Sequence, residues 1–168
     1  MLLYNDTFSE IEDAEYIESV YANAFCSAVK EFFNSRFRGC VKINCDIENR
    51  GAIIPSYLMP TLLLKELLSL CQKDIFIFIS IYDVGEKIMF DIKPHGIDNM
   101  DAVCTPMLIK LARSGGMNII QNDNNIQLTL ATAYSDRRNI YAPIAIDDVS
   151  KIISLINGIF FKKKYQPL

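Results

Sequence analysis

The spacing of hydrophobic residues in the first part of the chain changes from a helical to a strand period. From about Ser9 to Phe37, apolar residues recur at steps of three and four, which predicts one long helix. Gly39 ends that helix, and alternation from Cys40 to Ile47 then predicts a half-buried strand. The apolar stripe of the helix can pack on its own domain or form the seam of a dimer, and the sequence leaves both possibilities open.

The central stretch from Ile53 to Lys73 predicts a loop with two prolines followed by an amphipathic helix. Pro60 suits the first helical turn, where its missing N–H removes no hydrogen bond. The apolar face recurs at i, i+1, i+4, i+5 and i+8 and consists of Leu63, Leu64, Leu67, Leu68 and Cys71.

The remaining segments are expected to alternate between hairpins and helices. In chain order they are a hairpin of residues 75–82 and 87–93, a loop at 94–96, a helix over 101–113, a hairpin of 118–121 and 125–133, and a helix from Asp147 to about Phe160. This order favours an α+β fold, a two-layer sandwich in which helices cover one face of a mixed, mostly antiparallel sheet. Residues 1–38 are interpreted as an N-terminal helix that can serve for dimerisation, and residues 39–168 as the globular domain with an extra C-terminal helix.

Composition narrows the class of protein. The 168 residues are 51% hydrophobic with a net charge of −3, which fits one domain with a sizeable core and gives no support to a nucleic-acid surface. No apolar run reaches the roughly 18 residues of a membrane span, and the acidic N-terminus lacks the positive charge of an export signal. The five cysteines show no zinc spacing, so we expect a reduced, cytoplasmic protein.

The central helix and its flanking segments follow a recognisable frame. Residues 60–71 read P-T-L-L-L-K-E-L-L-S-L-C, preceded by Arg36-Phe37-Arg38 and Pro55 and followed by Leu108–Gly116 before the second hairpin. This pattern resembles the ATP-binding domain of sensor histidine kinases, in the GHKL superfamily with its Bergerat fold. One subgroup of that family carries P-x-L-L-L-Q-P-L-V-E-N-A in the central helix, which aligns here without a gap. The resemblance covers residues 19–134 and implies the histidine-kinase-like ATPase fold.

The resemblance also shows which chemical groups of the family are replaced in the central helix. The asparagine that holds the phosphate-bridging magnesium ion aligns with Leu70, which offers no oxygen ligand. The preceding acid aligns with Ser69, a poor general base, so Glu66 one turn earlier is the candidate substitute. Lys73 is a candidate phosphate contact, although both Glu66 and Lys73 fit better as ordinary solvated surface residues.

The nucleotide-binding segments downstream are replaced as well. The family motif Asp-x-Gly-x-Gly falls on residues 92–96, Ile-Lys-Pro-His-Gly, and the Gly-rich phosphate segment falls on residues 99–106, which contain no glycine. His95, the only histidine, is expected in a loop, which argues against phosphotransfer through histidine. The vestigial nucleotide pocket implied by the resemblance consists of Glu66, Ser69, Leu70, Lys73, Ile92, Lys93, His95, Gly96 and Thr105.

The resemblance and these replacements predict a non-catalytic regulatory or protein-interaction module, a pseudoenzyme of bacterial signalling that contacts a protein partner or a second copy of itself. No catalytic residue, metal ligand or cofactor is assigned, and whether the chain is an enzyme stays open. A divergent domain that binds or hydrolyses ATP with magnesium is the first alternative. A small-molecule sensor that uses the emptied pocket is the second.

Overall fold

A five-stranded sheet is the central feature of the computed structural model, which describes residues 19–37, 39–71, 75–97, 99–134 and 145–161. The strands in spatial order are β2 (Val41–Asp46), β4 (Phe76–Val84), β5 (Lys87–His95), β7 (Ile126–Ala131) and β6 (Asn118–Gln121). β2 runs parallel to β4, and the other neighbouring strands are antiparallel. The predicted mixed, mostly antiparallel sheet is therefore confirmed.

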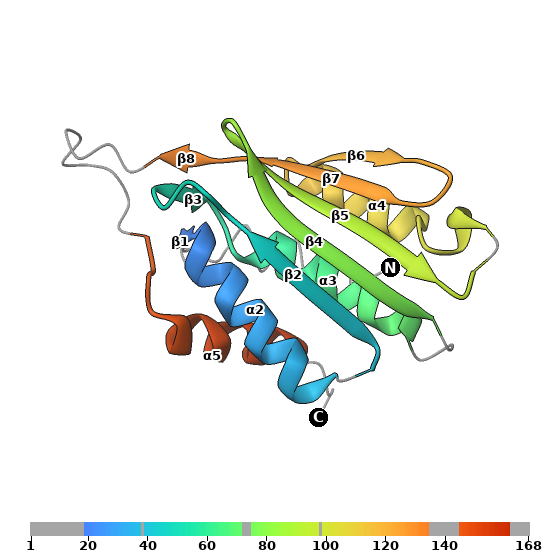
Figure 1. The fold of residues 1–168 in the computed structure, drawn as a ribbon, viewed down its shortest axis with the longest axis horizontal. Helices are drawn as coiled ribbons and strands as arrows, with labels where there is room; N and C mark the ends of the chain where they lie inside the picture. Colours follow the sequence, from blue (N-terminus) through green and yellow to red (C-terminus); the bar gives the residue numbers. More distant parts are fainter. Residues whose placement is uncertain (1–18, 38, 72–74, 98, 135–144, 162–168) are drawn as a thin grey trace, which may run out of the picture.

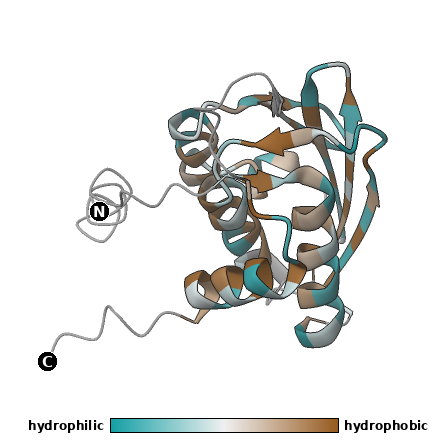
Figure 2. Ribbon diagram, turned by 90° about the vertical axis from the view of Figure 1, so that its left-hand side faces the viewer, coloured by the Kyte–Doolittle hydropathy of each residue, from teal (hydrophilic) through white to brown (hydrophobic). Residues whose placement is uncertain are grey.

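Helices cover one face of this sheet (Figure 1). They are α2 (Ala22–Arg36), α3 (Leu58–Cys71), α4 (Pro106–Ser114) and α5 (Val149–Phe160). Figure 2 shows the sheet nearly edge-on, with the helices to one side of it. Because side chains of a strand alternate between faces, Ile77, Ile79 and Ile81 of β4 are buried under the helices, whereas Phe76 and Phe78 lie half-buried on the open face. The predicted two-layer α+β architecture is confirmed.

A second, smaller sheet lies beside the first. It corrects the prediction for residues 53–54 and, as described below, the prediction for residues 19–21. It consists of β1 (Val20–Tyr21), β3 (Ala52–Ile54) and β8 (Ala133–Tyr134), in the order β1-β3-β8. The stretch Ile53–Ile54, expected in a loop, is thus a strand.

The long helix predicted from Ser9 is wrong at residues 19–21. The backbone there is extended, and the Tyr21 N–H donates to the carbonyl oxygen of Ile146 at 3.0 Å. Helical spacing continues through this stretch in the sequence, but pairing with β3 and Ile146 satisfies its backbone groups instead. Residues 9–18 of the predicted helix lie outside the described residues. The proposed division at residue 38 stays a prediction, although buried residues of α2 such as Phe25 belong to the same core as the sheet.

The central helix agrees closely with its prediction. α3 begins at Leu58, so Pro60 lies in the first turn as expected. Leu63, Leu64 and Leu67 are buried, each at 3% exposure or less. These residues belong to the hydrophobic core, and α3 contacts β4, α4 and α5.

The third helix starts later than predicted. The expected helix over residues 101–113 is wrong before Pro106: a short 3-10 helix, η1 (Met100–Ala102), comes first and α4 begins at Pro106. A proline disfavours helical backbone at the residue before it, so Thr105 stays extended. Its hydroxyl oxygen accepts the Leu108 N–H at 3.2 Å and caps the new helix.

The C-terminal helix packs on the N-terminal one. Asp148 caps α5, its carboxylate accepting the Ser150 N–H at 3.0 Å, close to the predicted start of this helix at Asp147. The Phe160 ring lies 4.9 Å from the ring of Phe32 and 5.7 Å from that of Phe33, centroid to centroid. The extra helix therefore extends the helical layer over α2.

Candidate functional site

The predicted pocket residues on α3 fall at its C-terminal end. Glu66 is half-buried, and Ser69 is exposed. The Ser69 hydroxyl donates to the carbonyl oxygen of Glu66 at 2.6 Å, so its proton is engaged by the backbone of the same helix. The side chain of Leu70 and the whole of Lys73 lie outside the described residues, and their predicted roles stay predictions.

The predicted pocket residues on β5 are divided between the two faces of the sheet. Ile92 is completely buried on the helical side, where it pairs with Ile79 and Ile126. Lys93 and His95 lie on the opposite, open face, because successive side chains of a strand alternate. The structure therefore does not bring Ile92 together with Lys93 and His95.

The end of β5 also differs from the sequence prediction. Pro94 and His95, expected in a loop, belong to the strand and pair with Ile77 and Phe76 of β4. The pairing of β5 with β7 already ends at Ile92, so Pro94 has only one neighbouring strand and its missing N–H is tolerated. Gly96, with φ of +92°, turns the chain away from the sheet, a backbone conformation that favours glycine.

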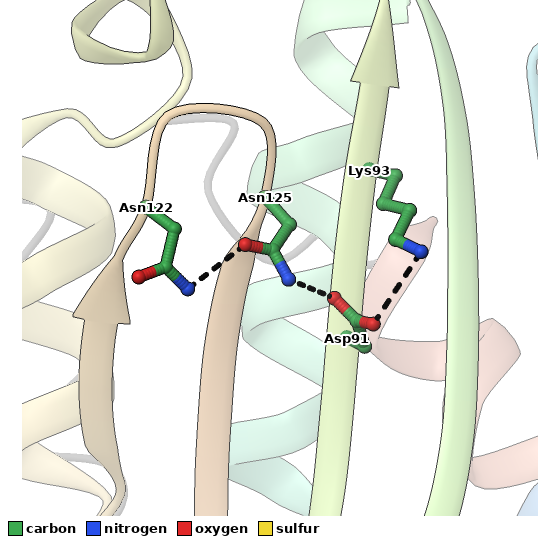
Figure 3. A network of polar contacts seen from close by, with 4 residues as sticks. All are labelled: Asp91, Lys93, Asn122 and Asn125. Carbon is green, nitrogen blue, oxygen red and sulfur yellow. Dashed lines mark hydrogen bonds and ion pairs between the residues drawn. The ribbon is translucent and has the colours of Figure 1, made fainter.

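A polar network lies on the open face next to Lys93 (Figure 3). Asn122 donates through Nδ2 to Oδ1 of Asn125 at 2.9 Å, and Asn125 donates through Nδ2 to Oδ1 of Asp91 at 2.7 Å. Lys93 Nζ lies 3.9 Å from the other oxygen of Asp91. This network fixes the turn between β6 and β7 to β5. Sequence reasoning missed it because it depends on strand register, and an isolated Asp91 between apolar neighbours was the only available signal.

Basic side chains surround Phe78 on the same open face. The Lys42 ammonium group lies 5.3 Å from the ring centroid, and the His95 ring meets the Phe78 ring edge-on at 6.0 Å. Lys93 is the strand partner of Phe78 on β5. A shallow pocket of about 270 Å³ adjoins this group and is lined by Lys93, Pro94, His95, Ile97, Met100, Asp123 and Asn124.

A second pocket, of about 240 Å³, lies at the N-terminal end of α3. Its lining comes from Pro55, Ser56, Met59, Pro60, Gly115, Gly116, Leu130 and Ala131. It contains none of the predicted site residues, and its walls are mostly apolar.

The segment that aligns with the family's phosphate loop uses its own backbone donors. Five consecutive N–H groups, those of residues 101–105, donate to acceptors within residues 99–103 at 2.8–3.2 Å. Met100, Val103 and Cys104 of this segment are buried. Gln121 Nε2 donates to Asp101 Oδ1 at 2.8 Å and ties the segment to β6. The segment is thus closed on itself and packed into the core.

The chemistry available in this segment is limited. Burial raises the pKa of the Cys104 thiol, and the nearby Asp101 carboxylate raises it further, so the thiol stays protonated at neutral pH. Thr105 is engaged as the cap of α4.

In the part of the chain that the structure describes, no group of three or more His, Cys, Asp or Glu side chains is placed to hold a metal ion. Among the same residues, no helix is both long and apolar enough to cross a membrane.

Comparison with known proteins finds similarity only at the level of structure. No protein-family profile and no curated protein sequence matches the chain. The nucleotide-free catalytic domain of histidine kinase ThkA matches with 12% identity and a TM-score of 0.48, over 68% of this chain and 94% of that one. The histidine kinase domain of the E. coli osmosensor EnvZ matches with 8% identity and a TM-score of 0.49, over 73% and 93%.

The cytoplasmic segment of histidine kinase QseC matches with 10% identity and a TM-score of 0.46, over 74% of this chain and 80% of that one. The fold is similar to that of histidine kinase catalytic domains. Similarity at these identities concerns the arrangement of helices and strands alone. The chemistry of this histidine-kinase-like fold has to be judged from its own residues.

Proposed function

We propose that this chain is a non-catalytic regulatory or protein-interaction module of bacterial signalling, built on a histidine-kinase-like fold. The observation that carries the proposal is the closed segment at residues 99–105. A phosphate cradle needs backbone N–H groups that point outward and are free to donate. Here the five N–H groups of residues 101–105 already have acceptors within the chain.

The end of β5 supports the same proposal. The family's adenine-binding carboxylate aligns with Ile92, a completely buried residue of the hydrophobic core. A carboxylate at this position would lie in the core without water, which is strongly unfavourable. Lys93 and His95 point to the open face, so the glycine loop of the family is replaced by regular strand.

Nucleotide titration tests the non-catalytic part of the proposal. We expect the melting temperature of the full chain to stay unchanged with millimolar ATP or ADP and magnesium. A ligand at about 100 times its Kd adds about 2.7 kcal/mol of stability, or roughly 5–11 °C for a domain of this size. A rise of that order would overturn the proposal in favour of the ATP-binding alternative.

If a rise occurs, matched variants locate the nucleotide. Glu66→Gln and Ser69→Ala would reduce the shift if the predicted pocket binds it, whereas Glu31→Gln, an exposed change on α2, would not. Phosphate release assayed on the same samples separates hydrolysis from binding.

For the partner we propose another protein. One similar structure is histidine kinase ThkA in complex with the response regulator TrrA, and we suggest by analogy that this chain acts through contact with a signalling protein. Sedimentation of the isolated full chain tests the alternative partner, a second copy. A dimer that is lost when residues 1–18 are removed would favour the homodimer and assign the contact to that segment, and a monomer would favour a different protein.

A further inference from the structure

Two cysteines from different elements meet beneath α2. Cys26 lies on the buried face of α2 at 3% exposure, and Cys45 lies half-buried on β2. Cys45 shares the helix-facing side of β2 with Val41 and Ile43. The Cys45 thiol donates to the carbonyl oxygen of Cys26, with 3.7 Å between sulfur and oxygen, so the Cys45 sulfur lies directly against the backbone of Cys26.

The two thiols differ in chemical character. The hydrogen bond from Cys26 lowers the pKa of Cys45 against the opposing effect of burial, and the positive charge of Lys30 lowers it further. The same hydrogen bond, together with burial, raises the pKa of Cys26 well above its ordinary value. Cys45 is therefore the better nucleophile, and Cys26 is held protonated beside it, an arrangement of attacking and resolving thiol.

The position of the pair gives a small oxidant access to one thiol only. Cys45 is half-buried on β2, an edge strand of the five-stranded sheet, so part of this residue is open to solvent. Cys26 is covered by the packing of α2 on the core. An oxidant that reaches Cys45 therefore leaves a modified sulfur within reach of a protected second thiol.

We propose that Cys26 and Cys45 form an oxidisable dithiol that a peroxide converts to an intramolecular disulfide between α2 and β2. The Cys45 thiolate attacks one peroxide oxygen, the O–O bond breaks, and hydroxide leaves to give a sulfenic acid on Cys45. The Cys26 sulfur then attacks the Cys45 sulfur, the S–O bond breaks, and the leaving hydroxide takes up the Cys26 proton as water. Two thiols are oxidised by two electrons, and one peroxide is reduced to two waters. This proposal is independent of the proposed function.

Peptide mapping after oxidation tests the proposal. The folded full chain is treated with hydrogen peroxide, its remaining thiols are alkylated, and its peptides are identified by mass spectrometry. The expected product is a species lighter by two hydrogen atoms, with the Cys26 and Cys45 peptides joined and separated again by dithiothreitol. The same treatment of the urea-unfolded chain should lose this selectivity. Joining of other cysteine pairs in equal amount, or stable oxidation of Cys45 without joining, would overturn the proposal.

Two substitutions and one control refine the test. Cys26→Ser should leave a sulfenic acid on Cys45 that a dimedone probe captures, and Cys45→Ser should abolish the disulfide. Cys104→Ser removes a buried thiol in a different segment and should leave the joined product unchanged. A disulfide that still forms in Cys45→Ser would contradict the assignment. The wild-type map stands as a test even if a variant fails to fold.

Discussion

The Lys65 side chain of α3 donates from Nζ to the carbonyl oxygen of Ile159 at 3.1 Å, in the last turn of α5. The two residues are 94 positions apart in sequence, so one exposed contact joins the central helix to the C-terminal one. The final carbonyls of a helix have no partner within it and carry partial negative charge, which an ammonium group complements.

Replacing this lysine should cost stability in proportion to that single contact. We expect Lys65→Met to lower the free energy of unfolding by about 0.5–1 kcal/mol, measured by urea denaturation. Lys151→Met, an exposed change on α5, is the matched control and should stay within about 0.5 kcal/mol of wild type. Equal losses in the two variants would contradict a specific role of Lys65.

The aromatic contact between α2 and α5 should depend on one phenylalanine far more than on its neighbour. Phe160 packs against the rings of Phe32, Phe33 and Phe37, whereas Phe161 is 48% exposed. We expect Phe160→Ala to destabilise the fold by about 2–4 kcal/mol and Phe161→Ala by about 1 kcal/mol or less, with its stacking on Arg36 lost. Thermal denaturation of both variants measures the difference, and a larger effect at Phe161 would refute the dominant role of Phe160 in this contact.

Two glycines should respond to alanine with opposite signs. A Cβ on Gly115 would lie 2.7 Å from Cβ of Met59, close to the backbone of α3 and hard to displace, so Gly115→Ala should cost about 1–3 kcal/mol. A Cβ on Gly158, within α5, would meet nothing within 4 Å, so Gly158→Ala should add about 0.5–1 kcal/mol through helix propensity. Urea denaturation of the two variants checks the signs, and a stabilised Gly115→Ala would refute the close approach of α4 to α3.

Asp83 should make stability depend on pH in the acidic range. Slight burial raises its pKa, but hydrogen bonds from the backbone N–H groups of Glu48 and Asn49, each at 2.9 Å, and from its own N–H outweigh this and lower the pKa overall. A carboxyl whose pKa is lower in the folded state stabilises the fold above its ordinary pKa of about 3.9, and this is lost as the pH falls through the folded-state value.

The corresponding variant isolates this contribution. Asp83→Asn should be less stable than wild type by about 0.5–1 kcal/mol at pH 7, a modest figure because the contacts are exposed. The difference should shrink as the pH is lowered below about 4, in urea denaturation at a series of pH values. A difference that is constant with pH would rule out the carboxylate as its source.

Local signals predicted most of the elements, and long-range pairing explains where they failed. The proline and leucine pattern predicted α3, and the start of α5 near Asp147 was predicted as well, because both signals act within a few residues. The stretch Val20–Tyr21 was not readable, because its partners Ile53–Ile54 and Ile146 are distant in sequence. A two-residue strand carries too little periodicity to outweigh a helical stripe beside it.

The candidate site was only partly predictable for the same reason. The predicted strand of residues 87–93 already places Ile92 and Lys93 on opposite faces by alternation. His95 could be assigned to a face only if the strand continued past Pro94, and the proline favoured ending the strand before it. The closed hydrogen bonding of residues 99–105 depends on Asn99 capping η1 and on Thr105 capping α4, which a missing glycine pattern does not reveal. The role of Leu70 remains a sequence prediction.

The aromatic seam between α2 and α5 joins the first and the last of the described helices, and this has a consequence for synthesis on the ribosome. Phe32 and Phe33 leave the ribosome well before their ring partner Phe160, because every strand of the five-stranded sheet lies between them in sequence. Until then these rings lack that cover, and an exposed apolar surface on a nascent chain is a target for chaperones. α5 therefore completes the helical layer and also covers the Phe32 and Phe33 rings that are exposed on the nascent chain.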